Sequence, residues 1–440
     1  MYFDNLHHSQ ASTKLLLLAS RYCSALSTHF NTICSSVHNN NCTMIRLDCK
    51  VLHYQWGRKG AESIVAQLRK DLIEEDEHYA ELWMGTHTRG PSHVKEGEAR
   101  IPLGDYFRDH QEVLGEHEKE STGLQFLLKV LSVGKCLSLQ LHPTKEQAQK
   151  LHSEDQTNYP DANHKPELTI ALTDFEIFCG FQKPDKILEN IRSHESLVEL
   201  VGEKALSGLD ASKGEDEKKV ALKNIFTQIC TIPKEELGNL LTKLLGDIFL
   251  KEERSSTDDL IMGLSEHFPE DIGILTPLFL NYVKLKPGEA TFLGPNEPHS
   301  YISGDCIECM AQSDNTIRAG LTPKFKNVNL FCENLTYRMG GPPIFTPSQG
   351  AEGVDEYSPE VQEFAVHKLS KEVSVIQPIA AVSILIVVNG SATILPNEGN
   401  EEKIEKGDVL LLPQKVEAKL SEKCDNFLAF RAFTPPPKEK

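Results

Sequence analysis

A helical stretch between two strand-rich stretches is the feature that most constrains how this chain can fold. From Pro184 to Phe268, apolar residues recur at steps of three and four, as they do on one face of a helix. Before and after this stretch, apolar and polar residues alternate in short runs bounded by Gly and Pro, which is typical of strands. The sequence therefore predicts a mainly β protein with an α-helical insertion.

The second strand-rich stretch predicts the kind of β domain. A strand, the turn Pro287-Gly288, another strand and then His299 follow one another in the pattern of a cupin-type jelly roll. Residues 407–413 repeat part of this pattern without a comparable set of histidines and carboxylates. We therefore expect two cupin-type jelly-roll barrels, the second degenerate and without metal, plus an α-helical domain.

The predicted domain plan has five segments. An N-terminal extension precedes a catalytic barrel that the helical domain divides in two, and a degenerate barrel ends the chain. Their expected bounds are 1–43, 44–183, 184–270, 271–344 and 345–440.

Smaller elements follow from the same patterns. Ser63 to Glu75 has the apolar spacing of an amphipathic helix, and Ser207 to Lys219 is charged enough to be a loop between helices. Asn389-Gly390 is typical of a hairpin turn, so residues 381–388 and 392–395 are predicted to pair with each other.

Composition limits the possible partners. A chain of 440 residues is too long for one typical core, and 39% hydrophobic with 25% charged residues is ordinary for a soluble protein. A net charge of −18 argues against nucleic acid as a partner, and no apolar run is long enough to span a membrane. The 11 scattered cysteines indicate reduced thiols. We expect a cytoplasmic monomer.

Residues 1–43 differ from the rest of the chain. They are rich in Ser, His, Asn and Thr, and Lys14 and Arg21 are their only Lys or Arg residues. A transit peptide is acid-poor and Ser-rich, as this segment is, but it also needs more arginine. We expect a disordered or non-native extension, with a transit peptide as the alternative, and a chain that begins at Met44 should be equally stable and active.

Two upstream clusters carry candidate ligands. Ser138, Gln140 and His142 alternate along one predicted strand, so their side chains share a face and the last two can reach one ion. Farther on, Pro166 favours extended geometry for Lys165, so that Lys165 and Glu167 project together.

The stretch from His299 to Lys324 completes the set. A Gly/Pro-rich turn places His299 at the start of a strand, with Tyr301 on the same face. Glu308, Asp314 and Arg318 then lie among apolar residues, where a charge is costly unless it is paired or used. Two histidines, a carboxylate and an amide oxygen suit zinc better than magnesium or calcium, although a Gln ligand is unusual.

The stretches Tyr159–Glu167 and His299–Lys324 closely resemble the signatures of the type I phosphomannose isomerases of the cupin superfamily. The resemblance extends more loosely from Met44 to Phe433, and Ser300 stands where the family usually has alanine. It implies one zinc per chain and places Trp56 and Glu81 near the substrate. The implied ligands are Gln140, His142, Glu167 and His299.

The resemblance also implies a reaction. Mannose 6-phosphate and fructose 6-phosphate would interconvert through a cis-enediol, feeding GDP-mannose synthesis and mannose use. Arg318 would stabilise the developing oxyanion. Asp314, Lys165 and a zinc-bound water all remain possible bases. Substrate contacts are expected from Ser138 and Lys324 at the phosphate and from Tyr301 in the pocket.

Alternative interpretations remain at this stage. Arg318 could instead form a structural ion pair with Asp314, four residues earlier. The whole chain could be a cupin that binds metal or sugar without catalysis, or an enzyme for another phosphosugar or an iron-dependent oxidation. The presence of Lys165, Arg318 and Asp314 together favours the isomerase.

Overall fold

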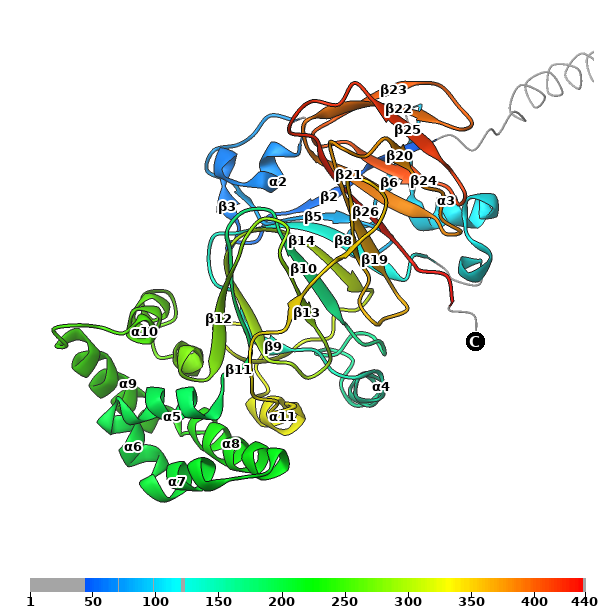
Figure 1. The fold of residues 1–440 in the computed structure, drawn as a ribbon. Helices are drawn as coiled ribbons and strands as arrows, with labels where there is room; N and C mark the ends of the chain where they lie inside the picture. The colour runs from blue at the N-terminus through cyan, green and yellow to red at the C-terminus, as the bar shows by residue number, and fades with distance from the viewer. Residues whose placement is uncertain (1–43, 70, 98, 120–122, 438–440) are drawn as a thin grey trace, which may run out of the picture.

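The computed structural model describes residues 44–69, 71–97, 99–119 and 123–437 (Figure 1). The expectation for residues 1–43 lies outside this part. None of the helices in the described ranges combines the length and apolarity needed to cross a membrane.

The β unit that contains the predicted site residues is called the catalytic unit below. It is built on an 11-stranded sheet. Its main path runs β16-β13-β10-β14-β8-β5-β2, and the other four strands join it through β14, β11 and β9. The strands are β2 (Lys50–Leu52), β5 (Glu81–Met84), β8 (Phe126–Val133), β9 (Leu139–Leu141), β10 (Glu167–Ala171), β11 (Phe175–Phe181), β12 (Leu280–Leu285), β13 (Ala290–Leu293), β14 (His299–Ala311), β15 (Ile317–Gly320) and β16 (Ile344–Phe345).

Strand β14 organises this unit, because its two halves pair with different neighbours. The first half pairs with β11 and β9, and the second half with β10 and β8. Gly304 lies between the halves at φ 111°, and a Cβ there would approach the Asp174 carbonyl oxygen to 2.5 Å, so only glycine fits. Within the described residues the pairing closes no ring, so the cupin-type barrel is an open one.

The helical insertion is confirmed and forms its own layer at the lower left of Figure 1. It packs against the catalytic unit through a core shared with Phe178 and Phe181 of β11. Its elements are α5 (Pro184–Arg192), α6 (Glu195–Val201), α7 (Glu203–Ala211), α8 (Glu215–Cys230), α9 (Lys234–Phe249), α10 (Ser256–His267) and the 3₁₀ helix η4 (Ile272–Leu278).

The predicted loop from Ser207 to Lys219 is wrong. Only residues 212–214 separate α7 from α8, and the acidic run at Glu215, Asp216 and Glu217 forms the first turn of α8. Acidic side chains stabilise a helix start because they face the positive end of the helix dipole. The charge run therefore marked a helix terminus.

The C-terminal unit is a sandwich of two sheets around an apolar core. A nine-stranded sheet runs β17-β18-β19-β26-β21-β24-β1-β6-β7 and a four-stranded sheet runs β20-β25-β22-β23. Their strands are β1 (Ile45–Asp48), β6 (His93–Glu96), β7 (Ala99–Pro102), β17 (Ser348–Gln349), β18 (Val354–Tyr357), β19 (Ala365–Ser370), β20 (Val375–Ile376), β21 (Ser383–Asn389), β22 (Ser391–Pro396), β23 (Glu402–Glu405), β24 (Val409–Leu412), β25 (Ala418–Ser421) and β26 (Leu428–Phe433).

Two features of this unit differ from the predictions. The turn at Asn389-Gly390 is present, with Gly390 at φ 73°, but it carries the chain from one sheet to the other. The flanking strands β21 and β22 therefore do not form the predicted hairpin. In addition, β1 pairs with β24 and with β6, so the first described strands extend the sheet of the C-terminal unit.

The remaining elements connect the sheets. The predicted helix from Ser63 to Glu75 is only the four-residue α2 (Ile64–Gln67), capped by the Ser63 hydroxyl. After α2 the chain forms a loop, in which the Glu74 N–H donates to the Tyr79 hydroxyl at 2.9 Å. The others are β3 (Arg58–Lys59), β4 (His78–Tyr79), α3 (Leu103–Asp109), α4 (Lys145–Glu154), α11 (Val328–Asn334) and the 3₁₀ helices η1 (Gly60–Glu62), η2 (Gln111–Val113) and η3 (Glu116–Glu118).

Candidate metal centre and active site

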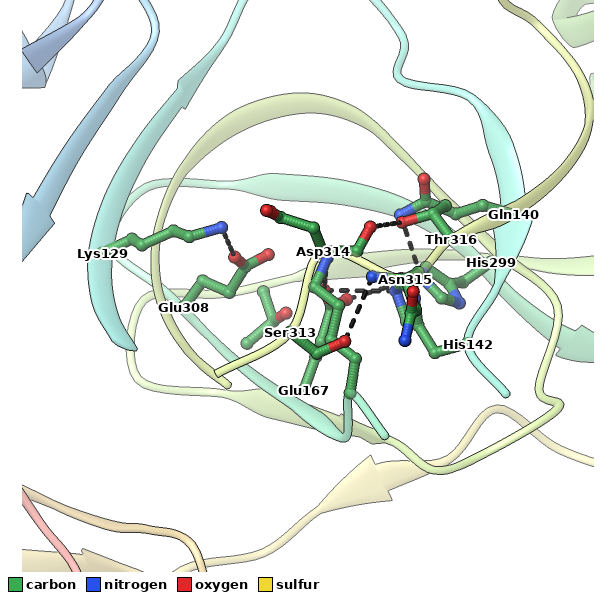
Figure 2. A network of polar contacts seen from close by, with 12 residues as sticks. Lys129, Gln140, His142, Glu167, His299, Glu308, Ser313, Asp314, Asn315 and Thr316 are labelled. Carbon is green, nitrogen blue, oxygen red and sulfur yellow. Dashed lines mark hydrogen bonds and ion pairs between the residues drawn. The ribbon is translucent and has the colours of Figure 1, made fainter. Parts of the chain in front are cut away.

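Three buried side chains from three strands meet inside the catalytic unit (Figure 2). His142 directly follows β9, Glu167 begins β10 and His299 begins β14. The Nε2 atoms of His142 and His299 lie 3.2 and 3.5 Å from the two Glu167 carboxylate oxygens. All three side chains are enclosed, and their ligand atoms lie within 4.8 Å of one another, as a shared metal ion requires.

The hydrogen bonds of the two imidazoles favour metal binding. The Nδ1 atom of His142 lies 2.8 Å from the Asn315 carbonyl oxygen, and that of His299 lies 3.0 Å from the Glu297 carbonyl oxygen. Because a carbonyl only accepts, each Nδ1 carries the proton and each Nε2 presents a lone pair. Burial lowers the pKa of His142 to about 4, and its Nε2 makes no hydrogen bond within the described residues.

Gln140 lies beside this cluster. It is the ladder partner of His299, and its Nε2 is 3.3 Å from the His299 Nε2. Its Oε1 accepts a hydrogen bond from the Ser138 hydroxyl at 2.8 Å. A metal ion would bind the Oε1 atom of Gln140, which now faces Ser138. The side-chain amide would therefore have to turn by 180°, and a bound cation would favour that turned orientation. Gln140 as fourth ligand stays a prediction.

Glu167 is supported by two further groups. Lys165 Nζ lies 2.9 Å from its Oε1, and the Tyr301 hydroxyl donates to its Oε2 at 3.3 Å. Burial acts to raise the pKa of Glu167, but Lys165 and His142 hold it well below its usual range, so the carboxylate is charged. Tyr301 is fully enclosed and also contacts the Thr169 hydroxyl at 2.6 Å. Tyr301 therefore supports Glu167 within the enclosed cluster, and its predicted role in the substrate pocket stays a prediction.

Asp314 has partners that the sequence did not reveal. Its carboxylate pairs with the Arg89 guanidinium, and the His87 Nε2 lies 3.4 Å away. Burial acts to raise the pKa of Asp314, but His87 and Arg89 hold it below its usual value. The alternative in which Arg318 serves as the structural partner of Asp314 is therefore wrong.

Arg318 and Lys324 are unpaired cations near the cluster. Arg318 lies opposite Gln140 in the β15–β9 ladder, and Lys324 Nζ lies 5.4 Å from the centre of the Tyr54 ring. In the part of the chain that the structure describes, neither forms an ion pair with a carboxylate. Burial lowers the pKa of both side chains, and the charge of Arg318 lowers that of Lys324 further. A partly buried arginine and an exposed lysine, neither with an acidic partner among the described residues, form a site for an anionic group.

A second buried network lies next to this site. Lys129 Nζ is 2.8 Å from Glu308 Oε2 and 3.5 Å from Glu81 Oε2, and the Trp83 indole N–H also donates to Glu81 (Figure 2 shows the first pair). Burial acts to lower the pKa of Lys129, but Glu308 and Glu81 raise it. Glu81 is thus paired with Lys129, whereas the predicted Trp56 is half-buried and stacks on Tyr54 at 5.8 Å.

Sequence reasoning missed three of these residues. Lys129 had a signal, since it is a lone lysine within an apolar eight-residue strand. Arg89 and His87 lie in a turn between strands, where no periodicity points to a site.

Comparisons with known proteins agree with this geometry. The chain matches the model of the phosphomannose isomerase type I catalytic domain over residues 44–184 and that of the type I helical insertion domain over residues 200–280. It is 41% identical to the probable mannose-6-phosphate isomerase of Caenorhabditis elegans over 408 residues, covering 90% of this chain and 97% of that one. The chain belongs to the type I phosphomannose isomerase family. The rat mannose-6-phosphate isomerase is 40% identical, over 83% of this chain and 92% of that one.

Solved structures of the family share the fold. The apo form of mannose 6-phosphate isomerase from Salmonella typhimurium superposes with a TM-score of 0.76 at 25% identity, covering 89% of this chain and 99% of that one. A mannose 6-phosphate isomerase bound with zinc and yttrium gives 0.76 at 26% identity, with the same coverage. The predicted family, the predicted enzyme class and the mainly β fold with a helical insertion are confirmed.

Proposed function

We propose that this chain interconverts mannose 6-phosphate and fructose 6-phosphate with one zinc ion held by His142, Glu167, His299 and Gln140. The observation that carries the proposal is the three-residue cluster with both Nε2 lone pairs facing a charged carboxylate. Nitrogen and carboxylate ligands suit zinc, and a mannose 6-phosphate isomerase of the same fold was solved with zinc. When bound, zinc supplies a Lewis acid for the substrate oxygens.

The unpaired cations bind and orient the substrate in this proposal. Lys324 meets the phosphate as a point charge, and Ser138 exchanges its hydrogen bond to Gln140 for one to the phosphate. Arg318 lies opposite Gln140 in the β15–β9 ladder. It stabilises the negative charge that develops on the sugar oxygens along the path to a cis-enediol.

A single base moves the proton between C2 and C1. We assign this role to Asp314, whose carboxylate is kept charged by His87 and Arg89 and whose side chain is 20% exposed. Lys165 is less suitable, because its ammonium group holds Glu167 at 2.9 Å and must stay charged to do so. Lys165 instead keeps the metal ligand ionised.

The cellular setting is part of the same proposal. An enzyme with this substrate pair connects fructose 6-phosphate to mannose use and GDP-mannose synthesis, and we place it in the cytoplasm as a monomer. Size-exclusion chromatography with light scattering tests the monomer, and fractionation of cells tests the compartment.

A coupled isomerase assay on metal-analysed protein tests the reaction. We expect turnover of mannose 6-phosphate, about one zinc per chain, and loss of turnover on chelation that zinc restores. The alternative, a cupin that binds metal or sugar without catalysis, predicts bound zinc without turnover. Active protein without a stoichiometric divalent ion would disprove the zinc assignment, and activity that depends on oxygen would favour an iron-dependent oxidation.

A further inference from the structure

Helix α8 of the insertion packs along one face against α11, the helix that follows the active-site strand β15. Lys223 Nζ donates to the Glu333 carbonyl oxygen at 3.4 Å and lies 5.9 Å from the centre of the Tyr337 ring. The Phe226 ring lies 6.4 and 6.3 Å from those of Phe331 and Tyr337. This interface joins the helical insertion to the catalytic unit.

Two cysteines lie in the same interface. Cys230, the last residue of α8, is four residues beyond Phe226 and seven beyond Lys223, so it shares their helix face. Cys332 lies in α11, directly between Phe331 and Glu333. Both cysteines belong to one apolar cluster, Cys332 enclosed and Cys230 partly exposed, and their thiol groups interact with each other.

The surroundings make the Cys332 thiol the more acidic of the two. Its hydrogen bond with Cys230 lowers the pKa of the Cys332 thiol, and the nearby Lys223 ammonium group adds to this effect. The same interaction, together with burial, raises the pKa of Cys230. A partly exposed thiol beside a more acidic one is the arrangement in which the first is oxidised and the second resolves it.

The sequence draws attention to a different pair, Cys306 and Cys309, which form its Cys-x-x-Cys motif. They lie on β14, where residues three apart point to opposite faces. Cys306 accordingly packs in one apolar cluster and Cys309 in another. This pair cannot bond without unravelling β14, so it provides a control within the same chain.

We propose that Cys230 and Cys332 are a site of reversible disulfide formation that ties the helical insertion to α11. The oxidant class is a hydroperoxide. The partly exposed Cys230 sulfur gives up its proton and attacks the peroxide oxygen, which breaks the O–O bond and leaves a sulfenic acid on Cys230. The departing alkoxide or hydroxide takes up that proton and leaves as an alcohol or water. The Cys332 thiolate then attacks the Cys230 sulfur and expels hydroxide, which takes up a proton to form water. Two thiols thus lose two electrons to one peroxide, and a dithiol reverses the reaction.

Hydrogen bonds connect the helix that carries Cys332 to the active-site strand β15. The Asn327 side chain accepts from the Leu330 N–H and caps α11, while the Asn327 backbone N–H donates to the Arg318 carbonyl oxygen at 2.9 Å. A disulfide at Cys332 therefore fixes the insertion to the helix that is anchored on the Arg318 strand.

Peptide mapping of the full-length protein tests the proposal. Reduced protein is freed of reductant, treated with hydrogen peroxide at a low molar excess, alkylated and digested without reduction. We expect a linked peptide that contains Cys230 and Cys332, loss of two titratable thiols, and a higher melting temperature than that of the reduced protein. A dithiol should reverse all three changes.

Single serine variants decide the assignment. Cys230→Ser should abolish the link and the rise in melting temperature, whereas Cys306→Ser should leave both intact. Cys230 is partly exposed, so its variant is expected to fold even if Cys332→Ser does not. A linked peptide that joins other cysteines, or sulfinic acid at Cys230 with Cys332 still free, would overturn the proposal. These readouts do not depend on isomerase activity.

Discussion

The two β units bury cations in opposite ways. In the catalytic unit, Lys129 contacts Glu308 and Glu81, so its charge is balanced by carboxylates. In the C-terminal unit, Arg431 is 1% exposed, and its partners are the Ser383 hydroxyl at 2.8 Å and the Gln377 carbonyl oxygen at 2.7 Å. No carboxylate of the described residues pairs with Arg431, and burial lowers its pKa to about 10.

The histidines show the same difference. His299 lies beside the candidate metal ligands His142 and Glu167, whereas His367 lies opposite Arg431 in the β19–β26 ladder and packs edge-on against the Phe433 ring at 4.9 Å. Burial lowers the pKa of His367 to about 4, and Arg431 contributes to this. Glu356 Oε1 also lies 4.0 Å from the His367 Nε2, but among the described residues only His142, Glu167 and His299 gather as a group that could hold a metal ion. The comparison teaches that a buried histidine can serve a metal site only where other ligand side chains meet it.

Replacing His299 and His367 in turn should give the largest difference between the two β units. His299→Ala removes a ligand from the cluster, so we expect loss of zinc and a fall in turnover on the order of a thousandfold, because the several kcal/mol that a metal supplies are lost. His367→Ala should leave zinc content and turnover nearly unchanged. Metal analysis and the coupled assay measure both, and a zinc-loaded, active His299→Ala protein would refute the proposed ligand set.

Replacing the two buried cations should sharpen the comparison in stability. Lys129→Met leaves Glu308 and Glu81 charged and unpaired, which should cost about 3–5 kcal/mol of unfolding free energy. Arg431→Met leaves only neutral acceptors without a donor, so a smaller cost of about 1–2 kcal/mol is expected. Denaturant unfolding measures both. Equal losses would show that the acidic partners of Lys129 do not matter.

The pH dependence of these two variants should also differ. Burial raises the pKa of Glu308 above its unfolded value, so an unpaired Glu308 costs stability only once it ionises. The deficit of Lys129→Met should therefore grow as pH rises from about 4 to neutral, where the unfolded carboxyl is already charged. Arg431→Met should show a smaller trend, because it removes only the contribution that Arg431 makes to the lowered pKa of His367.

Arg318 is functional in the proposed mechanism, whereas the contacts of Arg431 are structural, so the two arginines should respond differently to replacement. Arg318→Ala should lower turnover by roughly a hundred- to a thousandfold while zinc content and melting temperature stay normal, as expected when a preorganised charge donor is lost. Arg318→Lys keeps the charge but not the planar fork, so we expect partial recovery. Arg431→Ala should show the opposite pattern, with a lower melting temperature and normal turnover per zinc. Near-normal turnover in zinc-loaded Arg318→Ala would shift oxyanion stabilisation to Lys165.

The smallest effect is expected at Lys324. Lys324→Ala removes one charged contact to the phosphate, so KM should rise about tenfold, which corresponds to ~1.4 kcal/mol, with kcat little changed. Lys326→Ala is the matched control, since Lys326 instead pairs with Asp271 at 2.8 Å. A change in kcat but not in KM for Lys324→Ala would place this lysine in the chemical step.

Strand alternation predicted part of the candidate ligand set because it is local, whereas the full set of four came from the family resemblance. Ser138, Gln140 and His142 share a face whatever the strand pairs with, and the strand that starts at His299 was recognisable from its turn. Lys129 became a partner of Glu308 only through the pairing of β8 with β14, which brings the two residues opposite each other. Alternation in one strand carries no information on which strand lies beside it.

The same limit explains the errors in the fold. The Asn389-Gly390 turn was predicted correctly, but its return strand β22 joined the other sheet. The helix predicted at Ser63 to Glu75 had suitable spacing, yet its second half is a loop in which the Glu74 N–H donates to the Tyr79 hydroxyl. In the first case the pairing of β22 within the other sheet overrode a local preference, and in the second a side chain only five residues farther along the chain did so.

The pairing of β1 with β24 has a consequence for how the protein is made. During synthesis β1 leaves the ribosome early, and its partner residues 409–412 leave almost last, so this sheet cannot be completed until translation is nearly finished. A fragment of residues 345–440 made alone would carry β24 as an uncovered sheet edge, which invites aggregation. Supplied separately, residues 44–119 contain the missing strands and should cover that edge.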